Sequence, residues 1–151
     1  MNTAGVGEPP DPSSDRARAA MRCALAALYV VAGIAHLWVP EHFLAITPSW
    51  VPLAPQVVLL TGVFELVASA ALLTRPWRRF AGIALAVYAL CVWPANFKHA
   101  LDGIDLPYIS ASWLYHGPRL ALQPVIMWWA LYCADVTDWP WRRRASGAGP
   151  S

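Results

Sequence analysis

The stretch LTGVFELVASAALL, residues 60–73, has the composition of a membrane-spanning helix but carries one carboxylate, Glu65. A lone acid at the centre of a lipid-facing helix is unfavourable by roughly 2.5 to 3.5 kcal/mol on insertion scales. Thr61, Glu65 and Ser69 are spaced i, i+4, i+8, so they form one stripe along such a helix. The stripe predicts a helix whose polar face lies against other helices or water.

The composition of the whole chain also favours a membrane protein. Of its 151 residues, 58% are hydrophobic and 13% are charged, and the mean hydropathy is +0.42. Soluble domains are roughly 45 to 50% apolar and 25% charged. The net charge of +2 is too small to indicate a nucleic-acid partner. The three cysteines are far apart, and we interpret them as small buried hydrophobic residues.

Four apolar runs predict an all-α, up-down-up-down bundle of four transmembrane helices. About 20 residues at a rise of 1.5 Å each cover the roughly 30 Å hydrocarbon layer. The membrane domain is predicted over residues 19–135, between a disordered tail at 1–18 and a basic tail at 136–151. The predicted spans are 19–39, 56–73, 80–96 and 118–134. A signal peptide is the alternative for the first run, which is long for a signal core and lacks a clear cleavage site.

The basic residues predict the orientation of this bundle. All of them except Lys98 and Arg119 lie before or at the start of the first span, between the second and third, or after the fourth. The connection at residues 40–55 contains none. The positive-inside rule therefore places both termini in the cytoplasm. Tryptophans near both ends of the spans fit an interfacial belt, and short connections make successive spans antiparallel neighbours.

Polar residues from all four spans are predicted to converge near the outer end of the bundle, in a polar pocket. They are His36, Glu65, Asn96, Arg119 and Gln123. We expect Glu65 to contact either Arg119 or His36, because a buried carboxylate needs a partner.

A purely structural role is the alternative for this pocket. Hydrogen bonds between membrane helices contribute about 0.6 kcal/mol each, which would account for Gln123, Thr61 and Ser69, and Asn96 could cap a helix end. The other three histidines lie in or near predicted loops and are expected to be solvated. No H-x-x-H or H-E-x-x-H spacing is present, so a metal site is not predicted.

Three segments together resemble the DoxX-like family of small bacterial integral membrane proteins. They are VVAGIAHLWVPEHFLAITPSWVP, LTGVFELVASAALL and WRRFAGIALAVYALCVWPANFKHAL. The shared features are a glycine and histidine ending the first span, a Pro-rich loop, Gly-x-x-Glu in the second span and Pro-Ala-Asn ending the third. In this chain they are Gly33 with His36, residues 48–52, Gly62 with Glu65, and residues 94–96. Leu37, where relatives often carry Phe, and the basic Lys98-His99 depart from the pattern.

The resemblance implies a multi-pass protein of the bacterial cytoplasmic (inner) membrane, acting as an accessory subunit of a quinone-linked or oxidative-stress redox assembly. The pocket would then bind a quinone head group or a small sulfur compound. The chain has no catalytic or redox-cofactor motif of its own, so electrons would come from a partner subunit. A non-catalytic scaffold or small-molecule binder, alone or as a homo-oligomer, is the alternative; a transporter is less favoured because four spans show no evident repeat.

Overall fold

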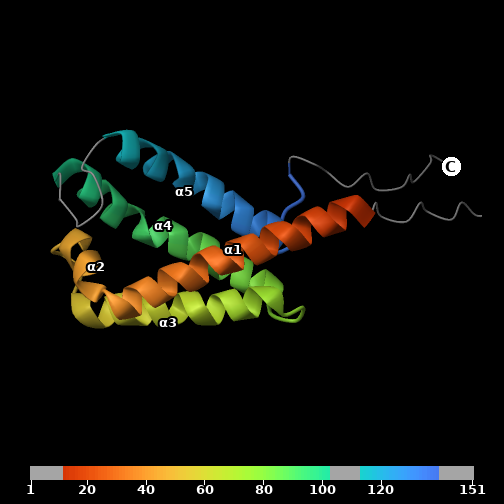
Figure 1. The fold of residues 1–151 in the computed structure, drawn as a ribbon, viewed down its shortest axis with the longest axis horizontal. Helices are drawn as coiled ribbons and strands as arrows, with labels where there is room; N and C mark the ends of the chain where they lie inside the picture. Colours follow the sequence, from red (N-terminus) through yellow and green to blue (C-terminus); the bar gives the residue numbers. More distant parts are fainter. Residues whose placement is uncertain (1–11, 103–112, 140–151) are drawn as a thin grey trace, which may run out of the picture.

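The protein is all-helical over the residues that its computed structural model describes, 12–102 and 113–139. These ranges contain five α-helices and no strand, which confirms the predicted all-α class (Figure 1). The helices are α1 (Pro12–Trp38), α2 (Pro40–Ile46), α3 (Ala54–Leu73), α4 (Arg78–Asp102) and α5 (Trp113–Cys133).

Three helices, α1, α3 and α4, are long and apolar enough to cross a membrane. They coincide with the first three predicted spans. Helix α5, the predicted fourth span, does not meet the same standard of apolarity, because Arg119, Gln123 and two prolines interrupt its first half. Its 21 residues nevertheless give it a length of about 30 Å.

The helix boundaries differ from the predicted spans at several places, among them the start of α5 at Trp113 rather than at 118. Helix α1 begins at Pro12, so residues 12–18 are helical rather than part of a tail. Helix α4 continues past residue 96 to Asp102, and the connection at 40–55 contains α2. Proline favours the first turn of a helix because it has no backbone N–H to leave unsatisfied, which accounts for the starts of α1 and α2. The parts of the predicted tails at 1–11 and 140–151 lie outside the described residues.

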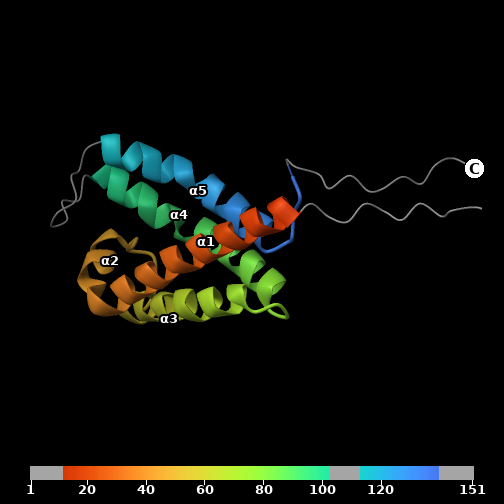
Figure 2. The ribbon, with the colours of Figure 1, turned by 45° about the vertical axis from the view of Figure 1, so that its right-hand side comes forward.

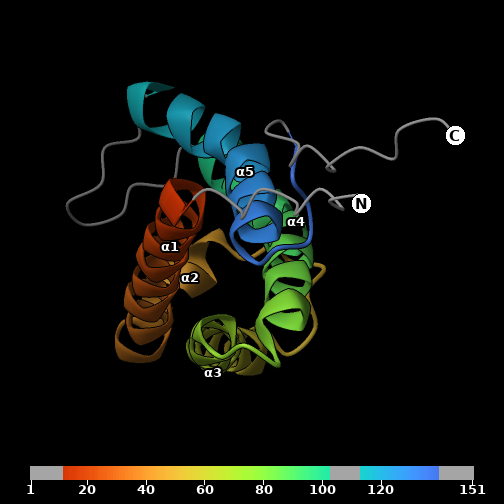
Figure 3. The same ribbon diagram turned by 90° about the vertical axis from the view of Figure 1, so that its right-hand side faces the viewer.

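The four long helices form two pairs. Helix α1 packs mainly against α3, and α4 mainly against α5. Figures 1 and 2 show that the pairs diverge toward the end of the bundle where α2 lies. Helix α2 contacts α1, α3 and α4, and in the view along the bundle it lies between α1 and α4 (Figure 3). This short helix therefore sits where the two pairs are furthest apart.

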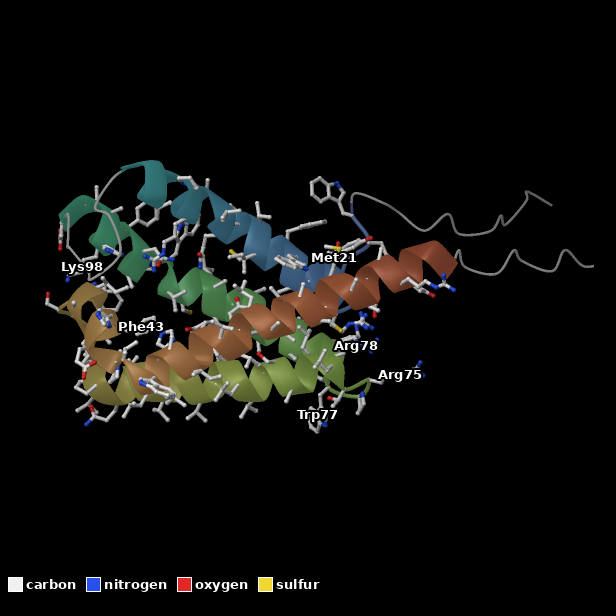
Figure 4. The ribbon with its side chains drawn as sticks, in the orientation of Figure 1. Met21, Phe43, Arg75, Trp77, Arg78 and Lys98 are labelled. Carbon is white, nitrogen blue, oxygen red and sulfur yellow. The ribbon has the colours of Figure 1, made fainter. Side chains whose placement is uncertain are left out.

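The two ends of the bundle differ in their side chains. Phe43 and Lys98 lie at the end where α2 is found, here called the α2 end (Figure 4). Arg75, Trp77 and Arg78 lie at the opposite end, here called the basic end (Figure 4). The sequence predicts the α2 end as the outer one.

The apolar core lies in the half of the bundle nearer the basic end. Leu25, Leu72, Leu85 and Cys133, one from each long helix, are fully buried there. Gly82 lets α4 approach α5 closely, because a Cβ at this position would collide with Ala134 and with the backbone of α5. Close packing of small residues is the usual way in which membrane helices associate. The half nearer the α2 end is not filled in this way.

Candidate functional site

A cavity of about 650 Å³ lies between the helix pairs toward the α2 end. Binding sites for small molecules typically have volumes of roughly 300 to 1,000 Å³, so this cavity is large enough to hold a small molecule. All five helices contribute to its wall, which is mostly apolar and aromatic. The five residues predicted to form a polar pocket all line this one cavity, and they are His36, Glu65, Asn96, Arg119 and Gln123.

Two glycines bring α1 and α3 together at the cavity. A Cβ on Gly33 would lie 2.8 Å from the carbonyl oxygen of Gly62, and a Cβ on Gly62 would lie 2.9 Å from the Cβ of His36. Each glycine precedes a polar residue by three positions, so His36 and Glu65 follow the point of closest approach on nearly the same helix faces. The glycine contact therefore places the imidazole beside the carboxylate.

Glu65 is almost completely buried, with 3% of its surface exposed. The hydroxyl of Tyr88, from α4, donates a hydrogen bond to its Oε1 atom at 2.8 Å. Its Oε2 atom lies 3.0 Å from Nδ1 of His36. Of the two contacts that the sequence offers for Glu65, the structure has the one with His36.

Although Oε2 lies this close to His36, it accepts no hydrogen bond from the described residues. Nδ1 of His36 also lies 2.9 Å from the carbonyl oxygen of Ala32, which can only accept, so this carbonyl and Oε2 compete for the one Nδ1–H group. Oε2 is a buried oxygen with no hydrogen-bond partner among the described residues. The ring of Phe43 stacks on that of His36, with centroids 3.7 Å apart, and holds the imidazole in place. A buried acceptor without a donor is unfavourable by about 1 to 3 kcal/mol, so this oxygen is available to a donor entering the cavity.

Asn96 and Gln123 join α4 to α5. The Asn96 amide donates to Oε1 of Gln123 at 3.2 Å, and the Gln123 amide donates to the carbonyl oxygen of Ala89. Ala89 lies in the turn before Pro94, where the proline ring disturbs the helix. Since α4 continues past Asn96, this residue does not cap a helix end. These hydrogen bonds join two helices, as the structural alternative for Gln123 expects.

Arg119 lies against His99 rather than in an ion pair with Glu65. Nη1 of Arg119 is 2.7 Å from Nδ1 of His99. A guanidinium can only donate, so Nδ1 of His99 is the acceptor in this contact. The expectation that His99 is solvated is wrong, because it is fully buried inside the extended α4. His42 is partly buried, and the side chain of His116 is outside the described part of the chain.

Sequence reasoning missed the aromatic residues of the cavity. Tyr29 and Tyr88 both line it, and their rings meet edge to face at 6.2 Å across the bundle. Tyr29 lies seven residues before His36, two helical turns earlier on the same face, so helical periodicity could have predicted that Tyr29 lines the cavity. Phe43 could not have been found in this way, since it depends on how α2 folds back.

The cysteines also differ from expectation. Cys133 is buried, but Cys23 and Cys91 are exposed, and Cys91 lines the cavity. The interpretation as buried residues is therefore wrong for two of the three. In the described part of the chain, no cluster of three or more His, Cys, Asp or Glu side chains is placed to hold a metal ion.

A second polar cluster lies at the basic end. Asp135 pairs with Arg18 at 3.0 Å, Arg78 at 3.4 Å and Arg22 at 3.5 Å, so one carboxylate connects α1, α4 and the end of α5. Asp138 binds Arg18 as well. Asp135 has a positive φ of 60°, and the bonds Val136 N–H to Leu131 O and Asp135 N–H to Tyr132 O form a Schellman cap, in which glycine is the usual residue. An aspartate at this strained position fits its role in binding the arginines.

The fold and the cavity define a small helical protein with apolar, membrane-length helices and, between them, a mostly apolar cavity that holds a buried carboxylate. The model of a domain family of unknown function, DUF8561, matches residues 25–134. The chain belongs to this family. No curated protein and no solved structure matches the chain.

Proposed function

We propose that this chain is a multi-pass membrane protein that binds a small molecule in the cavity, with Glu65 as its main polar contact. The observation that carries this proposal is the Oε2 atom of Glu65, which is buried beside His36 and has no hydrogen bond within the described residues. An ionisable residue inside a membrane bundle destabilises the bundle by roughly several kcal/mol unless another group pairs with it, so an unpaired one suggests a functional role. A ligand hydroxyl or N–H group would supply the missing donor.

The membrane arrangement is also part of this proposal. Helix α5 would be the fourth span, because it is long enough and pairs with α4 along the bundle. The basic end would face the cytoplasm by the positive-inside rule, which places the cavity in the outer half. With the resemblance to DoxX-like proteins, this favours the bacterial inner membrane.

A quinone or quinol head group suits the cavity best among the ligands that the sequence suggests. A quinol hydroxyl can donate to Oε2 of Glu65, and the Tyr88 hydroxyl lies on the other carboxylate oxygen. The His36 and Glu65 pair could hold the proton that such a head group releases or takes up, since histidine commonly serves in proton exchange. Electrons would pass to or from a partner subunit, so the chain would act as an accessory subunit of a membrane redox assembly.

Thermal unfolding of the detergent-purified protein tests this function. Quinone and quinol analogues, menaquinone analogues and small sulfur anions are each added to the wild type, to Glu65→Gln and to Glu41→Gln. Glu41 lies exposed on α2 and is the matched control. A ligand at 100 times its Kd should stabilise the wild type and the control by about 2.7 kcal/mol, and Glu65→Gln much less. An equal shift in all three proteins would remove Glu65 from the site, and no shift with any compound would contradict the proposed ligand class.

A non-catalytic scaffold is the second candidate. The hydrogen bonds among Asn96, Gln123 and Ala89 favour it, because they join two helices without a ligand. In that case Glu65→Gln should keep the protein's cellular function as long as the fold survives.

A further inference from the structure

The cavity reaches the surface of the bundle between α1 and α5. Leu28 of α1 and Leu122 of α5 both line the cavity, and they are 45% and 50% exposed. Lining the cavity does not by itself expose a side chain, because Tyr29 and Gln123, their sequence neighbours, also line it and are only 6% exposed each. The two leucines therefore mark one place where the cavity wall is exposed, here called the leucine opening; Trp50, which is 71% exposed, and the exposed Cys91 also line the cavity.

Among the described residues, polar contacts join α1 to α5 only near the basic end. Trp129 of α5 donates to the carbonyl oxygen of Met21, and Arg22 donates to that of Cys133. Within the described residues, every hydrogen bond and ion pair between α1 and the segment from α5 to Asp138 involves residues 18–22 of α1. In the described part of the two helices, no polar contact joins α1 to α5 at the depth of Leu28.

On the opposite side, α3 and α4 are in contact at this depth, and the exposed Cys91, one turn further toward the α2 end of α4, also lines the cavity. Tyr88 hydrogen bonds to Glu65, and its ring lies 5.2 Å from that of Phe64. The Tyr29 and Tyr88 rings meet across the bundle and limit the cavity toward the basic end. A molecule whose head group binds Oε2 of Glu65 can thus extend toward the bilayer through the leucine opening.

We propose that the ligand carries a hydrocarbon tail that leaves the cavity between Leu28 and Leu122 and lies among the lipid acyl chains. This proposal rests on the proposed function and narrows the ligand to a class: a membrane-dissolved molecule with one apolar chain and a head group that donates a hydrogen bond. Such a molecule exchanges sideways with the bilayer and need not enter from water. Since lipid tails are as apolar as leucine, moving the ligand's tail from the bilayer to the opening adds little affinity. The opening therefore mainly determines which molecules can bind.

Binding of two probes tests the opening. The probes are a decyl-substituted benzoquinol and the same benzoquinol without the tail, and their Kd values are measured on the wild type, Leu28→Trp and Leu122→Trp in detergent. A tryptophan at the opening should overpack it and weaken the decyl probe about tenfold, while the tailless probe stays within about twofold. Val31→Trp and Val125→Trp are matched controls on the same helices, exposed at positions that do not line the cavity, and should bind both probes as the wild type does.

Variants with a smaller side chain separate obstruction from damage to the fold. Leu28→Ala and Leu122→Ala widen the opening and should bind the decyl probe within about twofold of the wild type. Equal weakening of both probes by the tryptophan variants, or wild-type binding of the decyl probe by both, would overturn the leucine opening and leave the Glu65 site standing. Undiminished binding of both probes to Glu65→Gln, or no binding to the wild type, would instead overturn the proposed function and this inference with it.

Discussion

The two ends of the bundle use carboxylates in opposite ways. At the basic end, Asp135 pairs with three arginines from α1 and α4. At the α2 end, Glu65 is more deeply buried but receives one hydrogen bond, from Tyr88, and its second oxygen has none among the described residues. The more exposed carboxylate thus has the more partners. The difference indicates that the basic end holds the helices together, whereas the α2 end keeps polar groups available inside a cavity.

The packing of the two halves follows the same division. The buried apolar cluster fills the half nearer the basic end, and the cavity occupies the other. The helix pairs are tied at one end and separate at the other, and α2 lies between them (Figures 1 and 3). We therefore expect substitutions at the basic end to change stability most and those at the cavity to change ligand binding most.

Removing the charge of Asp135 should have the largest effect on stability. Asp135→Asn keeps a residue that tolerates positive φ but leaves three arginines with less compensation. We expect a loss of about 2 kcal/mol in the free energy of unfolding, between the values for buried and exposed ion pairs, because the side chain is 37% exposed. Thermal or denaturant unfolding in detergent measures it. Asp138→Asn, which removes a partner of Arg18 alone among these three arginines, should lose about 0 to 1 kcal/mol; equal losses would contradict the central place of Asp135.

Gly62→Ala should destabilise the protein somewhat less and disturb the cavity as well. The new Cβ would lie 2.9 Å from the Cβ of His36 and 3.0 Å from the carbonyl oxygen of Gly33, so α1 and α3 must separate. We expect a loss of about 1 to 2 kcal/mol in unfolding free energy and weaker binding of any Glu65 ligand. Gly117→Ala is the control, because nothing lies within 4 Å of its Cβ position, and alanine there should be neutral or stabilising. If Gly62→Ala left the unfolding free energy and ligand binding unchanged, the glycine contact would not determine how closely α1 and α3 pack.

Much of the cavity could be predicted from the sequence because ionisable residues are rare in membrane spans. Glu65, His36 and Arg119 stand out on that ground, and the alternating direction of the spans puts them in the same half of the bundle. The glycine contact that decides between His36 and Arg119 as the partner of Glu65 depends on helix packing. Phe43 depends on the fold of α2.

Two other features depend on long-range geometry in the same way. His99 is buried because α4 continues past Pro94, whereas a proline usually predicts a helix end. Asp135 meets Arg18 and Arg22 only after the first and last helices of the described chain come together. Neither follows from local sequence patterns.

Removing the hydroxyl of Tyr88 should have a smaller effect. Tyr88→Phe takes away the one hydrogen bond to the Glu65 carboxylate that the described residues provide, and it should lower the unfolding free energy by about 1 kcal/mol. Tyr29→Phe is the matched control, since Tyr29 lines the same cavity and its ring meets that of Tyr88. A loss in Tyr29→Phe as large as that in Tyr88→Phe would show that the hydroxyl bond to Glu65 is not what matters.

Without ligand, Glu65→Gln should change stability least. It removes a buried carboxylate with an unmet acceptor, so the unfolding free energy should change by less than about 0.5 kcal/mol. Thermal unfolding of the ligand-free protein measures this value. A loss as large as that of Asp135→Asn would mean that Glu65 holds the bundle together, and the contrast between the two ends would disappear.

The most direct measurement is native mass spectrometry of the detergent-purified protein after incubation with decyl-substituted benzoquinol. Wild type, Glu65→Gln and Asp135→Asn are compared at equal concentrations. The account predicts one bound molecule on the wild type and on Asp135→Asn, and none on Glu65→Gln. Equal occupancy of Glu65→Gln and the wild type, or loss of the bound molecule in Asp135→Asn alone, would contradict it.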